Sequence, residues 1–181
     1  MQKKKFVIID PQNDFTSPKG IYSQTHPISQ ILDTKRRLVE LIRSQDKKDV
    51  IFIRSDYRPD QFKKGLSICL PGTFGNEIDN ELNIDEITIF FTKNDHSCFS
   101  SADFVTFLSQ TQTDTLMICG FLAEYCVKGT AIDALKQKYY VYLIQDCIGT
   151  GDDVQDRKVQ MLSDLHAEGA KIIDSFQLTK P

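Results

Sequence analysis

The sequence predicts a doubly wound α/β domain, in which a mainly parallel six-stranded sheet carries helices on both faces. Short apolar runs recur along the chain with helical patterns between them, and this alternation is typical of βα units. Most of the runs are continuously apolar, as expected for strands that helices cover on both sides. The length of 181 residues suffices for one domain with a substantial core, so we expect a single domain over residues 1–181.

The apolar runs place the six predicted strands in chain order. They are Phe6–Ile9, Val50–Arg54, Ile87–Thr92, Thr115–Cys119, Tyr140–Ile144 and Lys171–Ile173. The first helix is predicted over residues 31–44, where the apolar residues lie near one helical face. These are Ile31, Leu38, Leu41 and Ile42. The later helices are Ala102–Ser109, Cys126–Gln137 and Val154–Ala167, and Gly169 follows the last at a helix-ending position.

The segment from Ser55 to Asp85 is expected to be a long loop. It lacks clear periodicity and holds several proline and glycine residues. A long irregular loop in a compact domain is usually functional or covers a site. We therefore expect this segment to lie over the site of function.

Composition narrows the possible partners. A formal net charge of −3 does not indicate a protein that binds nucleic acid. No apolar run approaches the roughly 20 residues of a membrane helix. The first strand begins almost at the N-terminus, which leaves no room for a signal peptide, so we expect a cytoplasmic protein. The five cysteines form no C-x-x-C pair and are expected to be free thiols.

Three chemically capable side chains follow predicted strands. Asp10 ends the first strand, Lys93 ends the third, and Cys126 opens the helix after the fourth. The carboxyl ends of parallel strands share one edge of a sheet, and ligands bind there. Together the three supply a nucleophile, a proton carrier and a stabilising charge. The helix start and the nearby ammonium are both expected to lower the pKa of the Cys126 thiol.

Three segments resemble the isochorismatase-like cysteine hydrolase superfamily, which includes nicotinamidases. They are IIDPQNDF (8–15), KNDHSCF (93–99) and GFLAEYCVKGTAIDAL (120–135), and YVYLIQDCIGT (140–150) matches the strand that follows them. The resemblance implies a Rossmann-like fold and a Cys126–Lys93–Asp10 triad that hydrolyses a small amide-type C–N bond through a thioester. Asp10 would take the thiol proton, and Cys126 would attack the carbon of the substrate.

The resemblance also implies features of the oxyanion site and of assembly. It places a cis peptide at Phe121–Leu122, which would direct the N–H groups of Leu122 and Cys126 toward the developing oxyanion. It further implies a homo-oligomer.

The chain departs from the superfamily pattern where nicotinamidases bind a metal. Asp56 matches the aspartate of their Asp-x-His motif, but Arg58 and Ile68 stand where histidines are expected. Neither side chain can ligate a metal. None of the three histidines, at positions 26, 96 and 166, lies in the 55–85 segment. We therefore expect no catalytic metal and no cofactor.

Four residues are candidate substrate contacts. Arg54 and Arg58 could pair with a substrate carboxylate, the alternative being solvated arginines or a structural ion pair. Phe15 could stack on a planar substrate or belong to the core. His96 lies three residues after Lys93 and could touch the substrate.

Three alternative functions stay open. The first is a nicotinamidase whose metal ligands lie elsewhere in the chain. The second is a non-catalytic interaction protein that has kept the site by descent. The third is a redox sensor, which would use Cys126 as an exposed thiol of low pKa.

Overall fold

The computed structural model describes residues 3–82 and 89–178. Within these ranges one sheet contains six strands in the order β3-β2-β1-β4-β5-β6, and every neighbouring pair is parallel. Their bounds are β1 Lys4–Ile9, β2 Val50–Ser55, β3 Phe90–Lys93, β4 Thr115–Phe121, β5 Tyr140–Gly149 and β6 Lys171–Ile173. This sheet confirms the predicted doubly wound α/β class.

The strand bounds differ from the prediction at four carboxyl ends, and β2 ends at Ser55, one residue later than predicted. β4 continues to Phe121, and β5 runs to Gly149 rather than Ile144. The predicted strand 87–92 begins at residues 87 and 88, outside the described ranges, and the described β3 ends one residue later, at Lys93. The extra residues of β4 and β5 still pair with one another, after a register shift between Ile118 and Gly120.

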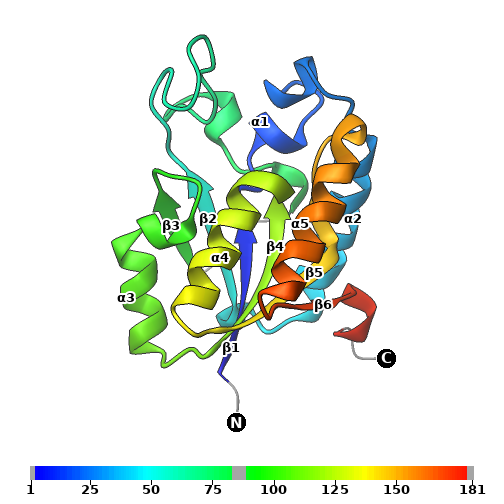
Figure 1. The fold of residues 1–181 in the computed structure, drawn as a ribbon. Helices are drawn as coiled ribbons and strands as arrows, with labels where there is room; N and C mark the ends of the chain where they lie inside the picture. Colours follow the sequence, from blue (N-terminus) through cyan, green and yellow to red (C-terminus); the bar gives the residue numbers. More distant parts are fainter. Residues whose placement is uncertain (1–2, 83–88, 179–181) are drawn as a thin grey trace.

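Helices cover both faces of the sheet (Figure 1). Figure 1 shows α3, α4 and α5 on one face and α2 on the other. Their bounds are α2 Ser29–Ser44, α3 Ala102–Gln110, α4 Lys128–Lys136 and α5 Gln155–Ala167. In α2 the predicted apolar face is buried at Ile31, Leu38 and Leu41, whereas Ile42 is partly buried. A four-residue helix, α1 Asn13–Thr16, is too short for a sequence pattern to predict.

The helix predicted over Cys126–Gln137 begins three residues earlier. A π-helix, Ala123–Val127, comes first, and α4 continues from Lys128. Cys126 therefore lies within the first turn of the helical segment and not at its first residue. π-helical turns of this kind are often found at functional sites.

The centre of the sheet brings β1 and β4 very close together. Gly120 of β4 takes a φ of +115°, and a Cβ at this position would lie 2.1 Å from the carbonyl oxygen of Ile9 in β1. Only glycine tolerates both the conformation and the approach. The chain leaves β1 and β4 in opposite directions along the sheet, and such a switch point is where open α/β sheets bind ligands.

The carboxyl edge of the sheet is covered by α1 and by the segment after β2, at the top of Figure 1. Gln12 joins the two ends of this segment. Its Nε2 donates to the carbonyl oxygens of Ser55 and Asn76, both at 2.8 Å, and its Oε1 accepts from the N–H of Ser55 at 2.7 Å. Asp14 accepts from the N–H of Cys69 at 2.7 Å, which ties the middle of the segment to α1.

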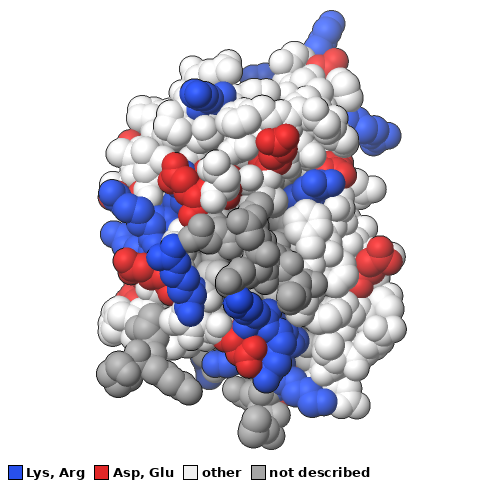
Figure 2. Space-filling model, turned by 180° about the vertical axis from the view of Figure 1, so that it is seen from behind, with Lys and Arg blue, Asp and Glu red and all other residues white. Residues whose placement is uncertain are grey.

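No helix in residues 3–82 and 89–178 is long and apolar enough to cross a membrane. On the face opposite to the view of Figure 1, basic and acidic side chains lie among one another, without a continuous basic surface in the described part (Figure 2).

Candidate active site

Asp10, Lys93 and Cys126 converge at the carboxyl edge of the sheet, and all three are almost completely buried. Asp10 follows β1 in a left-handed conformation with a φ of +48°, and Lys93 is the last residue of β3. Lys93 Nζ lies 2.9 Å from Asp10 Oδ2 and 3.5 Å from Cys126 Sγ. The structure therefore brings together the three residues that the strand ends suggested.

The ammonium group of Lys93 uses its three protons on three other acceptors. It donates to Ser55 Oγ at 2.6 Å, to Tyr57 OH at 3.0 Å and to the carbonyl oxygen of Asp95 at 3.0 Å. Ser55 Oγ in turn donates to Asp10 Oδ1 at 2.9 Å. Asp10 Oδ2 is buried and has no hydrogen-bond donor among the described residues, so its lone pairs can accept a proton.

Tyr57 links the ammonium to the sulfur, a role that sequence reasoning missed. Its hydroxyl accepts from Lys93 and lies 3.4 Å from Cys126 Sγ. Burial raises the pKa of Tyr57, so the hydroxyl keeps its proton and can donate it to a thiolate. No motif pointed to Tyr57, whereas Ser55 ends β2 and the strand-end argument could have included it.

The pKa of the Cys126 thiol is raised, whereas the sequence predicted a lowered pKa. Burial, with the Asp10 carboxylate next in importance, raises this pKa, and the opposing effect of Lys93 is smaller. For Lys93, burial lowers the pKa, but the charge of Asp10 and its other neighbours outweighs it and raises the pKa well above the usual value. The resting site thus holds a neutral thiol beside an ion pair. A buried neutral thiol does not suit a redox sensor.

His96 completes the surroundings of the sulfur. Its Nδ1 lies 3.8 Å from Cys126 Sγ, and its ring stacks on Phe62 with a centroid distance of 4.1 Å. Burial, followed by the charge of Lys93, lowers the pKa of His96. The imidazole is therefore neutral near pH 7 and contributes no charge to the site.

The peptide bond between Phe121 and Leu122 is cis, as the family resemblance implies. Leu122 immediately precedes the π-helix, and its carbonyl oxygen accepts from the N–H groups of Tyr125 and Val127. The N–H groups of a first helical turn lack partners within the helix. The oxyanion role of the Leu122 and Cys126 N–H groups stays a prediction.

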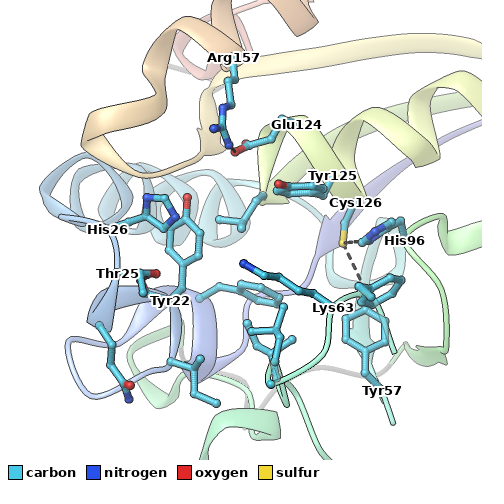
Figure 3. A pocket seen from close by; sticks show the side chains of 18 of the residues that line it. Tyr22, Thr25, His26, Tyr57, Lys63, His96, Glu124, Tyr125, Cys126 and Arg157 are labelled. Carbon is cyan, nitrogen blue, oxygen red and sulfur yellow. Dashed lines mark hydrogen bonds and ion pairs between the residues drawn. The ribbon is translucent and has the colours of Figure 1, made fainter. Parts of the chain in front are cut away.

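A cavity of about 690 Å³ opens beside the sulfur. Phe15, Leu122 and His96 line it together with Tyr57 and Phe62 (Figure 3). Phe15 is 5% exposed and belongs to both the core and the cavity wall, and its stacking on a substrate stays a prediction.

The two arginines expected to anchor a substrate lie outside this cavity lining. Arg54 Nε is 3.2 Å from Asp56 Oδ1, and its guanidinium lies over the Phe90 ring at 5.3 Å. Successive side chains of a strand point to opposite sides, so Arg54 is turned away where Ser55 faces the triad. Arg58 is exposed to solvent. The structural ion pair is therefore the correct interpretation for Arg54.

The residues at the family's metal position do not fit a metal ion. The Asp56 carboxylate pairs with Arg54 and accepts from Asn76 Nδ2 at 2.8 Å, and the nearby Ile68 offers no donor atom. In the part of the chain that the structure describes, no three His, Cys, Asp or Glu side chains stand close enough to hold a metal.

A doubly wound sheet with a buried thiol, carboxylate and ammonium at its carboxyl edge is typical of a hydrolase with a cysteine nucleophile. The chain belongs to the isochorismatase family, because residues 4–177 match the isochorismatase domain. This match confirms the prediction of an isochorismatase-like hydrolase.

Individual relatives agree with this assignment. Nicotinamidase of Saccharomyces cerevisiae is 22% identical over 214 residues, which cover 94% of this chain and 99% of that enzyme. YaaI of Bacillus subtilis, an uncharacterized isochorismatase family protein, is 27% identical over 161 residues, covering 83% and 82%. The zinc-bound pyrazinamidase of Pyrococcus horikoshii shares the fold with a TM-score of 0.80 at 23% identity, covering 95% and 99% of the two chains.

Proposed function

We propose that this protein hydrolyses the amide-type C–N bond of a small molecule through a thioester on Cys126, without a metal. Family membership and the nicotinamidase relative support a cysteine hydrolase that acts on amide bonds. One observation carries the proposal: a neutral buried thiol lies beside the Asp10–Lys93 ion pair, and Asp10 Oδ2, which faces Lys93 Nζ at 2.9 Å, accepts no hydrogen bond from the described residues.

Acylation begins when the thiol proton moves to Asp10 Oδ2 and the sulfur attacks the amide carbon. Lys93 and the Tyr57 hydroxyl stabilise the charge on the sulfur during this transfer, since both lie within 3.5 Å of it. The N–H groups of Leu122 and Cys126 would receive the oxyanion. Protonated Asp10 then gives its proton to the leaving nitrogen, the C–N bond breaks, and ammonia or an amine departs.

Deacylation uses the same carboxylate. Asp10 takes a proton from a water molecule, the hydroxide attacks the thioester carbon, and the C–S bond breaks. The proton held by Asp10 returns to the sulfur, and the carboxylic acid product leaves. Ser55 donates to Asp10 Oδ1 and so keeps the other oxygen, Oδ2, directed at the moving proton.

Nicotinamidase activity is the second candidate, favoured by the relatives. The Arg54 and Asn76 partners of Asp56 weigh against a metal that would hold a pyridine ring. Ammonia release from nicotinamide, measured before and after treatment with a chelator, tests this candidate. We expect any amidase activity to survive the chelator, and its loss with restoration by zinc would contradict metal independence.

We further propose a cytoplasmic location, which the free cysteines support, and a homo-oligomeric state, which the family resemblance supports. Gel filtration with light scattering measures the assembly directly, and a monomer at working concentration would contradict it.

Replacement of the nucleophile tests the reaction. Cys126→Ala is expected to abolish ammonia release from a panel of small amides, whereas Cys119→Ala should retain most of it. Cys119 is equally buried but lies in β4, so it controls for the loss of a core thiol. Mass spectrometry of the wild-type protein should show an acyl adduct on Cys126. Equal loss in both variants would contradict the assignment.

A further inference from the structure

The cavity extends well beyond the reacting sulfur, and its far end is cationic. Figure 3 shows Cys126 and His96 at one side and Arg157 at another, with Lys63 reaching over the space between. Lys63 and Lys64 come from the loop after β2, and Arg157 comes from the first turn of α5. Cations from two separate elements therefore line one space.

Glu124 holds Arg157 at this end. Thr150 Oγ1 donates to Glu124 Oε2 at 2.7 Å and fixes the carboxylate. The other oxygen, Oε1, is buried, has no hydrogen-bond partner among the described residues and lies 3.7 Å from Arg157 Nη1. The Arg157 side chain remains 51% exposed. A guanidinium has five N–H donors in a planar fork, so most of them stay available to a ligand.

The charges that line the cavity do not balance. Among the described residues that line the cavity, Lys63, Lys64 and Arg157 are cationic, and Glu124 is the one carboxylate. His26 is paired with Asp153 at 2.9 Å. Neither lysine forms an ion pair within the described residues. This excess of positive charge stands in a chain whose formal net charge is −3, so it marks the cavity as a site for an anion.

We propose that Arg157, with Lys63, binds a carboxylate at the far end of the substrate while Cys126 attacks the amide at the near end. The substrate class is then the monoamide of a small dicarboxylic acid, with its carbon chain against Phe15 and Leu66. A substrate with one carboxylate at this end fits the site, because the Glu124 carboxylate already occupies one side of the Arg157 guanidinium. This inference rests on the proposed amide hydrolysis and assigns its substrate class.

Matched substrates test the class. Ammonia release is measured from the monoamides of succinic, glutaric and adipic acid, and from butanamide, pentanamide and hexanamide, which lack the carboxylate. We expect the best monoamide to exceed its neutral partner about 10–100-fold in kcat/KM, the effect of a charge-assisted hydrogen bond. Equal or faster turnover of the neutral series would overturn the proposal.

A matched pair of arginine variants locates the effect. Arg157→Gln should remove most of the preference for the monoamide over its neutral partner, through a higher KM for the monoamide. Arg58→Gln is the control, because Arg58 is exposed and does not line the cavity. Equal effects of the two variants would contradict a binding role for Arg157.

A binding measurement separates the subsite from the reaction. Calorimetric titration of the Cys126→Ala variant with glutarate should show binding that Arg157→Gln weakens about 10-fold or more. Binding of this kind without amide turnover in the wild-type protein would retain the subsite and refute the proposed function. Turnover of neutral amides without glutarate binding would refute the subsite alone.

Discussion

The two ends of the cavity are built in different ways. At the sulfur, Asp10, Lys93 and Cys126 are at most 3% exposed, and they follow or end β1, β3 and β4 at the carboxyl edge of the sheet. At the far end the cations stand on a loop and on a helix start, and Arg157 is half exposed. The strand ends thus position the reacting side chains, whereas the loop after β2 and the start of α5 position the side chains proposed to bind the substrate.

This difference predicts how mutations should act. Buried charges lose their solvation, so the removal of one partner leaves the other uncompensated and costs stability as well as activity. Exposed charges keep most of their solvation, so their removal changes binding by a small amount and leaves the fold intact. The following variants test this contrast, starting with the largest expected effect.

Asp10→Asn should cause the largest loss. The variant lacks the proton acceptor, and proton transfer of this type contributes about 10²–10⁴-fold to kcat. It also leaves the Lys93 ammonium buried without its carboxylate, which should lower the free energy of unfolding by about 3–5 kcal/mol. Ammonia release and urea unfolding measure the two effects. Asp103→Asn, on the exposed start of α3, is the control. An active Asp10→Asn variant would mean that another group is the base.

Tyr57→Phe should have a smaller effect that is confined to activity. Loss of a hydrogen bond to the charged sulfur is expected to lower kcat about 10–100-fold, with little change in KM. The pH at which Cys126 becomes reactive should rise, because the thiolate loses one donor. Tyr125→Phe removes a hydroxyl from an exposed tyrosine in the cavity lining and serves as the control. An unchanged pH profile in Tyr57→Phe would assign the hydroxyl a structural role only.

The raised pKa of Cys126 predicts slow alkylation near neutral pH. Iodoacetamide reacts with the thiolate, so the rate at Cys126 should stay below that of the unfolded chain at every pH below its raised pKa. The gap should begin to close only above the ordinary thiol pKa of about 8.5. The same shift makes stability depend on pH. Folding raises the pKa of this thiol, so its contribution to stability is complete below the ordinary thiol pKa and is lost as the pH rises above that value. Peptide mapping after timed alkylation gives the rates, and fast labelling at pH 7 would contradict the shift.

Lys63→Gln should have the smallest effect. The side chain is exposed on a loop, so we expect a KM for the monoamides only a few-fold higher and no change in the free energy of unfolding. Added salt should reduce the difference from wild type. Lys136→Gln, at the exposed end of α4, is the control. A large loss of kcat in Lys63→Gln would show that the loop takes part in the chemistry itself.

The sequence predicted the sheet and the catalytic end well because both depend on strand order and strand ends. Asp10 and Lys93 can be placed from hydrophobic runs alone, since parallel strands finish at one edge. The predicted direction of the Cys126 pKa shift was wrong. The shift depends on burial and on the nearby Asp10 carboxylate, and no residue pattern reports either.

The two arginines that were expected to contact the substrate lie outside the cavity for a related reason. Arg54 and Arg58 are near the site in sequence, but the pleat of β2 and the path of the loop turn both away from the cavity. Arg157 comes from α5, more than sixty residues after Lys93, and only the packing of α5 beside the π-helix brings it to the cavity. Tyr57 was missed because its role depends on one hydroxyl position.

The Gln12 amide holds Ser55 and Asn76, the two ends of the loop that forms much of the cavity wall. Because these hydrogen bonds involve only the backbone of both partners, they do not depend on which side chains lie between them. The part of the loop after Tyr57 can therefore be exchanged while both loop ends stay in place. Libraries randomised between residues 58 and 68, with Gln12 retained, offer a direct route to new amidase specificities on this scaffold.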